Sequence, residues 1–155
     1  MVNTMLACFV FMNSVFFTAI EPNIELKSEL SKVEENVDFK VFIPENYNQW
    51  KLIIKSLAFD KKNPDSVLIT FEDKETKGKY IFECIQTKSN GDHPENGSIV
   101  NVNHNKARFT PWAASRNNQK PVGGILTWNQ NGTNIEMKSS YLTKEEMIQI
   151  AKKMK

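Results

Sequence analysis

The chain has 155 residues with a formal net charge of +2, and 25% of its residues are charged and 40% hydrophobic. This length suits one domain that can bury a core. The small net charge and the scattered lysines exclude a basic stripe that would follow nucleic-acid phosphates, so we expect no nucleic-acid partner. The two cysteines, Cys8 and Cys84, lack metal-ligand or redox spacing, and we predict that both are unpaired.

The N-terminal segment, residues 1–20, contains no charged side chain. Because a membrane-spanning helix needs about 20 mostly apolar residues, we expect this segment to enter a membrane as a transmembrane anchor or as a signal segment. Two further interpretations are that Met1 is internal to a longer chain and that Cys8 belongs to a lipobox. Too little apolar sequence precedes Cys8 for a lipobox to be favoured. The predicted organisation is a membrane segment 1–20, a linker 21–27, and a domain 28–155 on the extracytoplasmic side of the cell membrane.

The first part of this domain predicts a short helix and two strands. Ser28 is the expected N-cap of a helix whose apolar residues have helical spacing, namely Leu30, Val33 and Val37. The sequence FKVFIP, residues 39–44, predicts a strand that Pro44 ends. Residues 50–59 predict a longer strand.

Residues 66–88 predict a β-hairpin, because apolar residues alternate on both sides of a polar turn. The sequence SIVNVN, residues 98–103, predicts a further strand, which residues 104–109 continue after a bend. Asn131-Gly132 is a preferred type I′ turn pair. A two-residue turn there sets the register of a second hairpin, with the pairs Gln130–Thr133, Trp128–Ile135 and Leu126–Met137. Trp128 is therefore predicted to be a core residue between this hairpin and the last helix.

Residues 142–154 predict that helix. Thr143 is the expected N-cap, Glu146 completes a capping box, and Leu142 with Met147 forms a hydrophobic staple. The predicted apolar stripe consists of Met147, Ile150, Ala151 and Met154.

The order of these segments resembles a family of extracytoplasmic domains of unknown function from Gram-positive, spore-forming bacteria. Members of that family often follow a single membrane helix, including in anti-sigma-factor-like proteins. The resemblance covers residues 28–155 and rests on Pro44, Gly97 with Val100, Trp128 with Gly132, and Thr143, Glu146, Ile150 and Ala151. It implies a location and a fold type but no catalytic residues. The sigma-binding region of an anti-sigma factor is missing here, so that role is not implied.

We therefore expect an α+β fold, in which an antiparallel β-sheet packs against a C-terminal helix and an N-terminal hydrophobic helix precedes the domain. A LolA-like half-barrel and a Mog1/PsbP-like sandwich both fit this pattern. The main functional hypothesis is a membrane-tethered, non-enzymatic binding or sensing module. The alternative is a LolA-like carrier of lipid or another hydrophobic ligand, and a hydrolase with a dispersed site is the third hypothesis.

Residues that could perform chemistry are few. His93 and His104 have no ligand partner at metal-site spacing, and Cys84 alternates with aromatic residues on a predicted strand. We expect no catalytic residue, metal or cofactor, and therefore no enzyme. Cys84 is predicted to be a buried structural thiol.

The candidate contact site lies near the irregular segment 110–124. Arg108 and Arg116, the only arginines of the chain, flank Trp112 there. Arginine and tryptophan are frequent anchors of interfaces, so these three residues are predicted to contact a protein or a hydrophobic ligand. The alternative is that Trp112 fills one end of the core and that the arginines are solvated.

Overall fold

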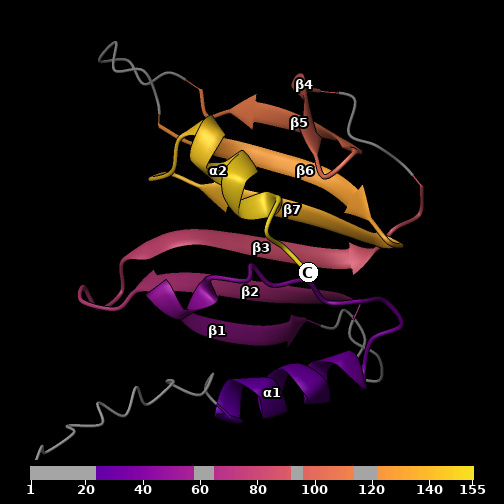
Figure 1. The fold of residues 1–155 in the computed structure, drawn as a ribbon, viewed down its shortest axis with the longest axis vertical. Helices are drawn as coiled ribbons and strands as arrows, with labels where there is room; N and C mark the ends of the chain where they lie inside the picture. Colours follow the sequence, from indigo (N-terminus) through magenta and orange to yellow (C-terminus); the bar gives the residue numbers. More distant parts are fainter. Residues whose placement is uncertain (1–23, 58–64, 92–95, 114–121) are drawn as a thin grey trace, which may run out of the picture.

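The computed structural model of this protein describes residues 24–57, 65–91, 96–113 and 122–155. They form a seven-stranded antiparallel sheet, and a C-terminal helix packs on one of its faces (Figure 1). The predicted α+β class is thereby confirmed. The hydrophobic segment 1–20, with Cys8, lies outside the described residues, and none of the described helices has the length and apolar character to cross a membrane.

The strands form two meanders that meet at the centre of the sheet, in the order β1-β2-β3-β7-β6-β5-β4. β3 and β7 form the junction, although the sequence between them contains the other three strands of the second meander. The strand bounds are β1 Trp50–Leu57, β2 Ser66–Asp73, β3 Tyr80–Lys88, β4 Ser98–Val102, β5 Asn105–Pro111, β6 Gly124–Gln130 and β7 Thr133–Ser139.

The β6–β7 hairpin has the register that its turn predicts. Trp128 pairs with Ile135, and Leu126 pairs with Met137. These four side chains are fully buried in one core cluster with Met147 and Ala151 of the C-terminal helix α2 (Lys144–Ala151). The turn residues Asn131 and Gly132 have φ angles of 47° and 81°, as a type I′ turn requires.

A second tight turn reverses the chain after β4, so the predicted continuation of residues 98–103 into 104–109 is wrong. Asn103 and His104 have φ angles of 48° and 69°, and β5 pairs antiparallel with β4. Asparagine tolerates this left-handed backbone better than most residues, which explains the turn without glycine. The segment is therefore a hairpin and adds a strand to the sheet.

Residues 40–45, which we name the crossing segment, are not the predicted strand. They run over the sheet without a ladder of their own, and only Pro44 makes a bridge, to Met154. The side chain of Gln86 on β3 replaces the missing strand partner: its Oε1 accepts from the Phe42 N–H at 2.8 Å, and its Nε2 donates to the Phe42 carbonyl at 2.7 Å. On β7, the Thr133 hydroxyl donates to the Lys40 carbonyl at 2.7 Å. The crossing segment is thus hydrogen-bonded to both strands of the central junction.

Two helices and a 3-10 turn complete the fold: α1 spans Ile24–Glu34, η1 spans Tyr47–Gln49 and α2 spans Lys144–Ala151. α1 already includes residues 24–27 of the expected linker, so Ser28 lies inside the helix and its predicted N-cap role is wrong. The capping box of Thr143 and Glu146 at α2 is confirmed. α2 is shorter than the predicted helix, because the chain leaves it after Ala151 and continues into the bridge with the crossing segment.

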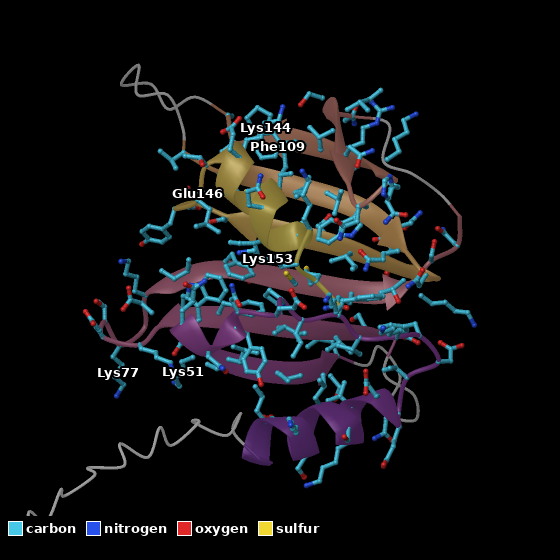
Figure 2. All side chains as sticks on the ribbon, in the orientation of Figure 1. Lys51, Lys77, Phe109, Lys144, Glu146 and Lys153 are labelled. Carbon is cyan, nitrogen blue, oxygen red and sulfur yellow. The ribbon has the colours of Figure 1, made fainter. Side chains whose placement is uncertain are left out.

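The space between the sheet and its helical cover is filled by side chains (Figure 2). Trp128, Phe42, Met147 and Met154 are at most 1% exposed there. Lys144 on α2 lies over the Phe109 ring, with its Nζ 5.5 Å from the ring centroid, at the end of this layer (Figure 2). The opposite face carries half-buried aliphatic residues and charges, as is usual for an antiparallel sheet with one solvated face.

Candidate functional site

The structure describes two of the three residues of the predicted contact site, Arg108 and Trp112, and these two do not line the same pocket. Arg108 lies on β5, where its Nη1 donates to the Gly97 carbonyl at 3.2 Å and its buried Nε has no partner within the described residues. Trp112 follows the end of the same strand and borders a surface pocket that Arg108 does not line. Arg116 lies outside the described residues. Trp112 thus remains a candidate contact residue, whereas Arg108 has a local role in holding the β4–β5 hairpin.

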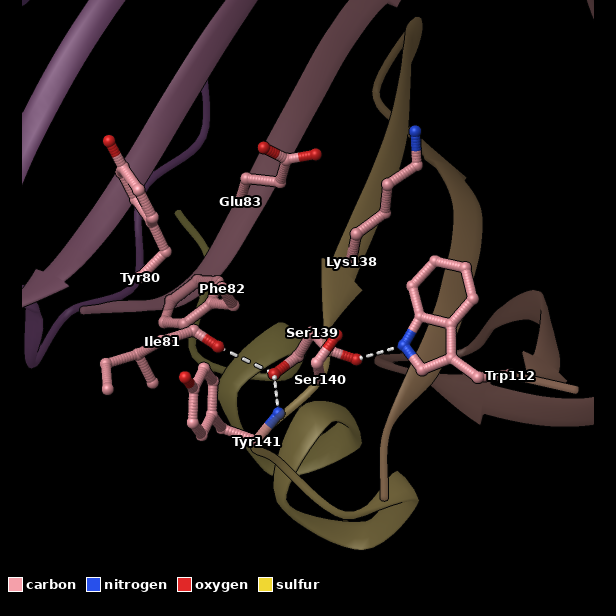
Figure 3. A pocket seen from close by; sticks show the side chains of 9 residues that line it. All are labelled: Tyr80, Ile81, Phe82, Glu83, Trp112, Lys138, Ser139, Ser140 and Tyr141. Atoms are coloured by element: carbon pink, nitrogen blue, oxygen red, sulfur yellow. Dashed lines mark hydrogen bonds between the residues drawn. The ribbon is translucent and has the colours of Figure 1, made fainter. Parts of the chain in front are cut away.

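The pocket beside Trp112 lies where the ends of β3 and β7 meet the loop that leads to α2 (Figure 3). Its volume is about 240 Å³. Its lining includes Tyr80 and Glu83 of β3, Lys138 and Ser139 of β7, Tyr141 of the following loop, and Trp112. We name this site the aromatic pocket.

Three aromatic side chains from separate segments border the aromatic pocket. Tyr80 and Tyr141 are 57% and 56% exposed, whereas Trp112 is half-buried. Figure 3 shows Tyr80 on one side and Trp112 on the other, with the ring of Tyr141 below them. Tyrosine and tryptophan combine an apolar ring with a polar group, so such exposed rings are suited to contact a ligand that is itself part apolar and part polar.

Ser139 holds the pocket together through four hydrogen bonds. Its hydroxyl donates to the Ile81 carbonyl at 2.6 Å and accepts from the backbone N–H groups of Tyr141 and Leu142 at 3.1 and 3.0 Å. Its carbonyl accepts from Nε1 of Trp112 at 2.7 Å (Figure 3). Ser139 therefore fixes β3, the loop before α2 and the indole of Trp112 relative to one another.

Two charged side chains lie between the tyrosine and tryptophan sides of the pocket. Glu83 and Lys138 are directly opposite one another on β3 and β7. Lys138 makes an ion pair of 2.7 Å with Glu136 on its own strand. The structure shows no hydrogen bond or ion pair from the Glu83 carboxylate to another described side chain, so this carboxylate is available as an acceptor.

No protein-family model, curated protein or solved structure matches this chain.

The nucleophiles and bases considered from sequence lie elsewhere. Cys84 is fully buried in the core, where burial raises the pKa of its thiol far above the usual range. His104 occupies the β4–β5 turn, and among the described residues its side chain makes no hydrogen bond to a serine or cysteine. His93 lies outside the described residues. The described residues contain no group of three or more His, Cys, Asp or Glu side chains that could hold a metal ion.

Sequence reasoning missed most of the pocket. Tyr80, Glu83 and Tyr141 are far from Trp112 in the chain, and the pairing of β3 with β7 brings them together. Ser139 does leave a local signal, because serine before a helix often bonds backbone N–H groups two and three residues ahead. That signal identifies a turn but does not reveal the contact with Trp112.

Proposed function

We propose that this chain is a membrane-tethered, non-enzymatic binding module whose domain lies on the extracytoplasmic side and recognises its ligand through the aromatic pocket. The observation that carries the binding role is the group of three rings, exposed Tyr80 and Tyr141 with half-buried Trp112, around the available carboxylate of Glu83. The charge-free segment 1–20 and the family resemblance support the tether and the location.

The arrangement of the pocket favours binding over a merely structural role for Trp112. Its indole N–H is satisfied inside the protein by the Ser139 carbonyl, which fixes the ring while part of its surface stays exposed. A rigid, half-exposed aromatic ring is an effective anchor, because little side-chain entropy is lost when a ligand covers it.

For the finer fold we propose the flatter, Mog1/PsbP-like sandwich. Among the described strands β1 and β4 form the edges of the sheet, and the side that α2 covers is filled by buried residues such as Trp128 and Phe42. A lipid carrier needs a large apolar cavity, so this packing disfavours the LolA-like alternative. Mass spectrometry of the purified protein under native conditions tests the carrier alternative, because a lipid carrier would retain one lipid per protein molecule.

The location is tested by fractionation of cells that produce a tagged chain. We expect recovery in the membrane fraction and digestion of the domain by protease added outside cells whose outer wall has been removed. Recovery wholly in the soluble cytosol would refute the tether and the extracytoplasmic location.

Binding is tested by photocrosslinking in cells from position 80 in the pocket. The matched control carries the photoreactive residue at position 77, which is exposed near the tip of the same β2–β3 hairpin but does not line the pocket (Figure 2). We expect a crosslinked species from position 80 that Trp112→Ala abolishes and that position 77 does not give. The same products from both positions, or no product from position 80, would contradict a binding role for this pocket.

A further inference from the structure

We propose that the aromatic pocket binds a carbohydrate chain, with one sugar ring seated against Trp112 and the tyrosines and its hydroxyls hydrogen-bonded to Glu83. This inference rests on the proposed binding function and names the class of ligand. It is carried by the shape and the hydrogen-bonding character of the pocket, considered against two other ligands that aromatic residues commonly recognise.

The rings and polar groups of the pocket alternate in a way that suits a sugar. A sugar ring has apolar C–H faces and a rim of hydroxyl groups, which both donate and accept hydrogen bonds. Trp112, Tyr80 and Tyr141 offer ring surfaces for the apolar faces. The Glu83 carboxylate between them can accept from hydroxyl groups, and such charge-assisted hydrogen bonds are about twice as strong as neutral ones.

A proline-rich peptide fits the pocket less well. Such peptides dock in aromatic grooves as polyproline II helices and present carbonyl acceptors, because proline has no N–H group. The groove must then supply donors. Here the indole N–H of Trp112 is used by Ser139, and one N–H of the Lys138 ammonium group is directed at Glu136, so the tyrosine hydroxyls and the rest of that ammonium group are the remaining donors. A polyproline ligand would leave the Glu83 carboxylate without a hydrogen bond, whereas sugar hydroxyls can donate to Glu83 and accept from the donors.

A quaternary ammonium ligand is also disfavoured. Aromatic rings attract cations, but cationic side chains already lie at this site. Nζ of Lys79 is 5.7 Å from the centroid of the Tyr141 ring, and Lys138 lines the pocket itself. A ligand cation would be a third positive group at this site and would have to share the Tyr141 ring with Lys79, whereas a neutral sugar adds no charge beside the ion pairs of Lys79 with Asp73 and Lys138 with Glu136.

The size of the pocket indicates one unit of a longer chain. Sites that enclose a drug-sized molecule usually measure roughly 300–1,000 Å³. The aromatic pocket measures about 240 Å³, and two of its three rings are more than half exposed. It can therefore hold one ring-sized unit while the neighbouring units extend into solvent.

Titration calorimetry of the full chain, kept in a detergent without a sugar headgroup, tests this assignment. The probes are the tetramer of N-acetylglucosamine, cellotetraose, maltotetraose, a proline decapeptide and tetramethylammonium chloride. We expect at least one oligosaccharide to bind and neither of the last two probes to do so. Tyr80→Ala, at an exposed position that tolerates truncation, is expected to weaken that binding about tenfold.

Substitutions inside and outside the aromatic pocket test whether the oligosaccharide binds there and not elsewhere on the surface. Glu83→Ala is expected to weaken binding of the same oligosaccharide at least as much as Tyr80→Ala does. Tyr47→Ala is the control, because Tyr47 lines a different hollow beside α1 and β1, and it is expected to leave oligosaccharide binding unchanged. The assignment is overturned if none of the three oligosaccharides binds at millimolar concentration. It is also overturned if the peptide or the ammonium ion binds in a Tyr80-dependent way, or if Tyr47→Ala weakens oligosaccharide binding as Tyr80→Ala does. A pocket-specific crosslink in cells without oligosaccharide binding would refute the carbohydrate assignment alone, whereas absence of both would also refute the binding function.

Discussion

Replacing Gln86 with methionine tests whether one buried amide holds the crossing segment on the sheet. Methionine has a similar length and no amide, so it removes both hydrogen bonds to Phe42 and leaves the volume nearly unchanged. Gln86 is 0% exposed and Phe42 is 1% exposed, so water cannot replace the lost partner. A buried donor or acceptor without a partner costs about 1–3 kcal/mol, and two such groups are orphaned here.

We therefore expect Gln86→Met to lower the free energy of unfolding by about 1–5 kcal/mol, after a partial offset from the more apolar side chain. The assay is urea unfolding followed by tryptophan fluorescence. Gln49→Met is the matched control, since Gln49 is exposed and its side chain makes no hydrogen bond within the described residues. Equal stability of the two variants would refute the argument that the Gln86 amide supports the crossing segment.

Gln86→Glu adds a pH test of the same contact. The glutamate keeps an acceptor for the Phe42 N–H, but only its protonated form can donate to the Phe42 carbonyl. Burial and this bond both favour the protonated form, so the folded-state pKa should lie above the unfolded value of about 4.3. The variant should approach wild-type stability below about pH 4 and lose stability as the pH rises through its folded-state pKa. A stability difference from wild type that does not vary with pH would contradict this reasoning.

Three further predictions concern other sites. Gly123→Ala should destabilise the fold by more than 2 kcal/mol, because the added Cβ would lie 2.0 Å from the Ser139 carbonyl oxygen of β7. Gly132→Ala should cost only about 1–2 kcal/mol, because its Cβ meets no atom within 4 Å and only the left-handed φ of 81° is unfavourable. Urea unfolding of both variants measures the difference. Hydrogen bonds from Thr143 to the Glu146 carboxylate lower the pKa of Glu146. The stability advantage of wild type over Glu146→Gln should therefore be present above about pH 4.3 and vanish as the pH falls through the lowered pKa. Urea unfolding at several pH values measures this advantage. Cys84 should react with a thiol reagent only at the rate of unfolding, because burial raises its pKa and blocks access; rapid labelling of the native Cys8→Ser variant would contradict this.

The sequence predicted the parts of the fold that local chemistry determines. Asn131-Gly132 determined a turn and hence the register that buries Trp128, and the pair Thr143 and Glu146 determined the start of α2. Each of these signals lies within a few residues and has a defined hydrogen-bonding geometry. These signals therefore do not depend on contacts with residues that are distant in the chain.

The errors arose where distant residues replaced local partners. The apolar residues of the crossing segment resemble a strand, but the hydrogen bonds of Phe42 go to a side chain 44 residues away. The Asn103-His104 turn lacks the glycine by which such hairpins are usually recognised. For the candidate site, Trp112 borders a surface pocket and its contact role stays a prediction, while Tyr80, Glu83 and Tyr141 join it only after β3 and β7 have paired.

The junction of β3 with β7 also divides the domain into two halves that could be made as separate polypeptides. Each half is a meander of consecutive strands, and the sheet order gives them a single shared ladder. The crossing segment belongs to the first half but bonds to Thr133 on β7 and pairs with Lys155 through Ile43, so each half completes the other. Chains cut between β3 and β4 would thus be expected to reassemble by fragment complementation, with the aromatic pocket formed only in the reassembled protein because its walls come from both fragments.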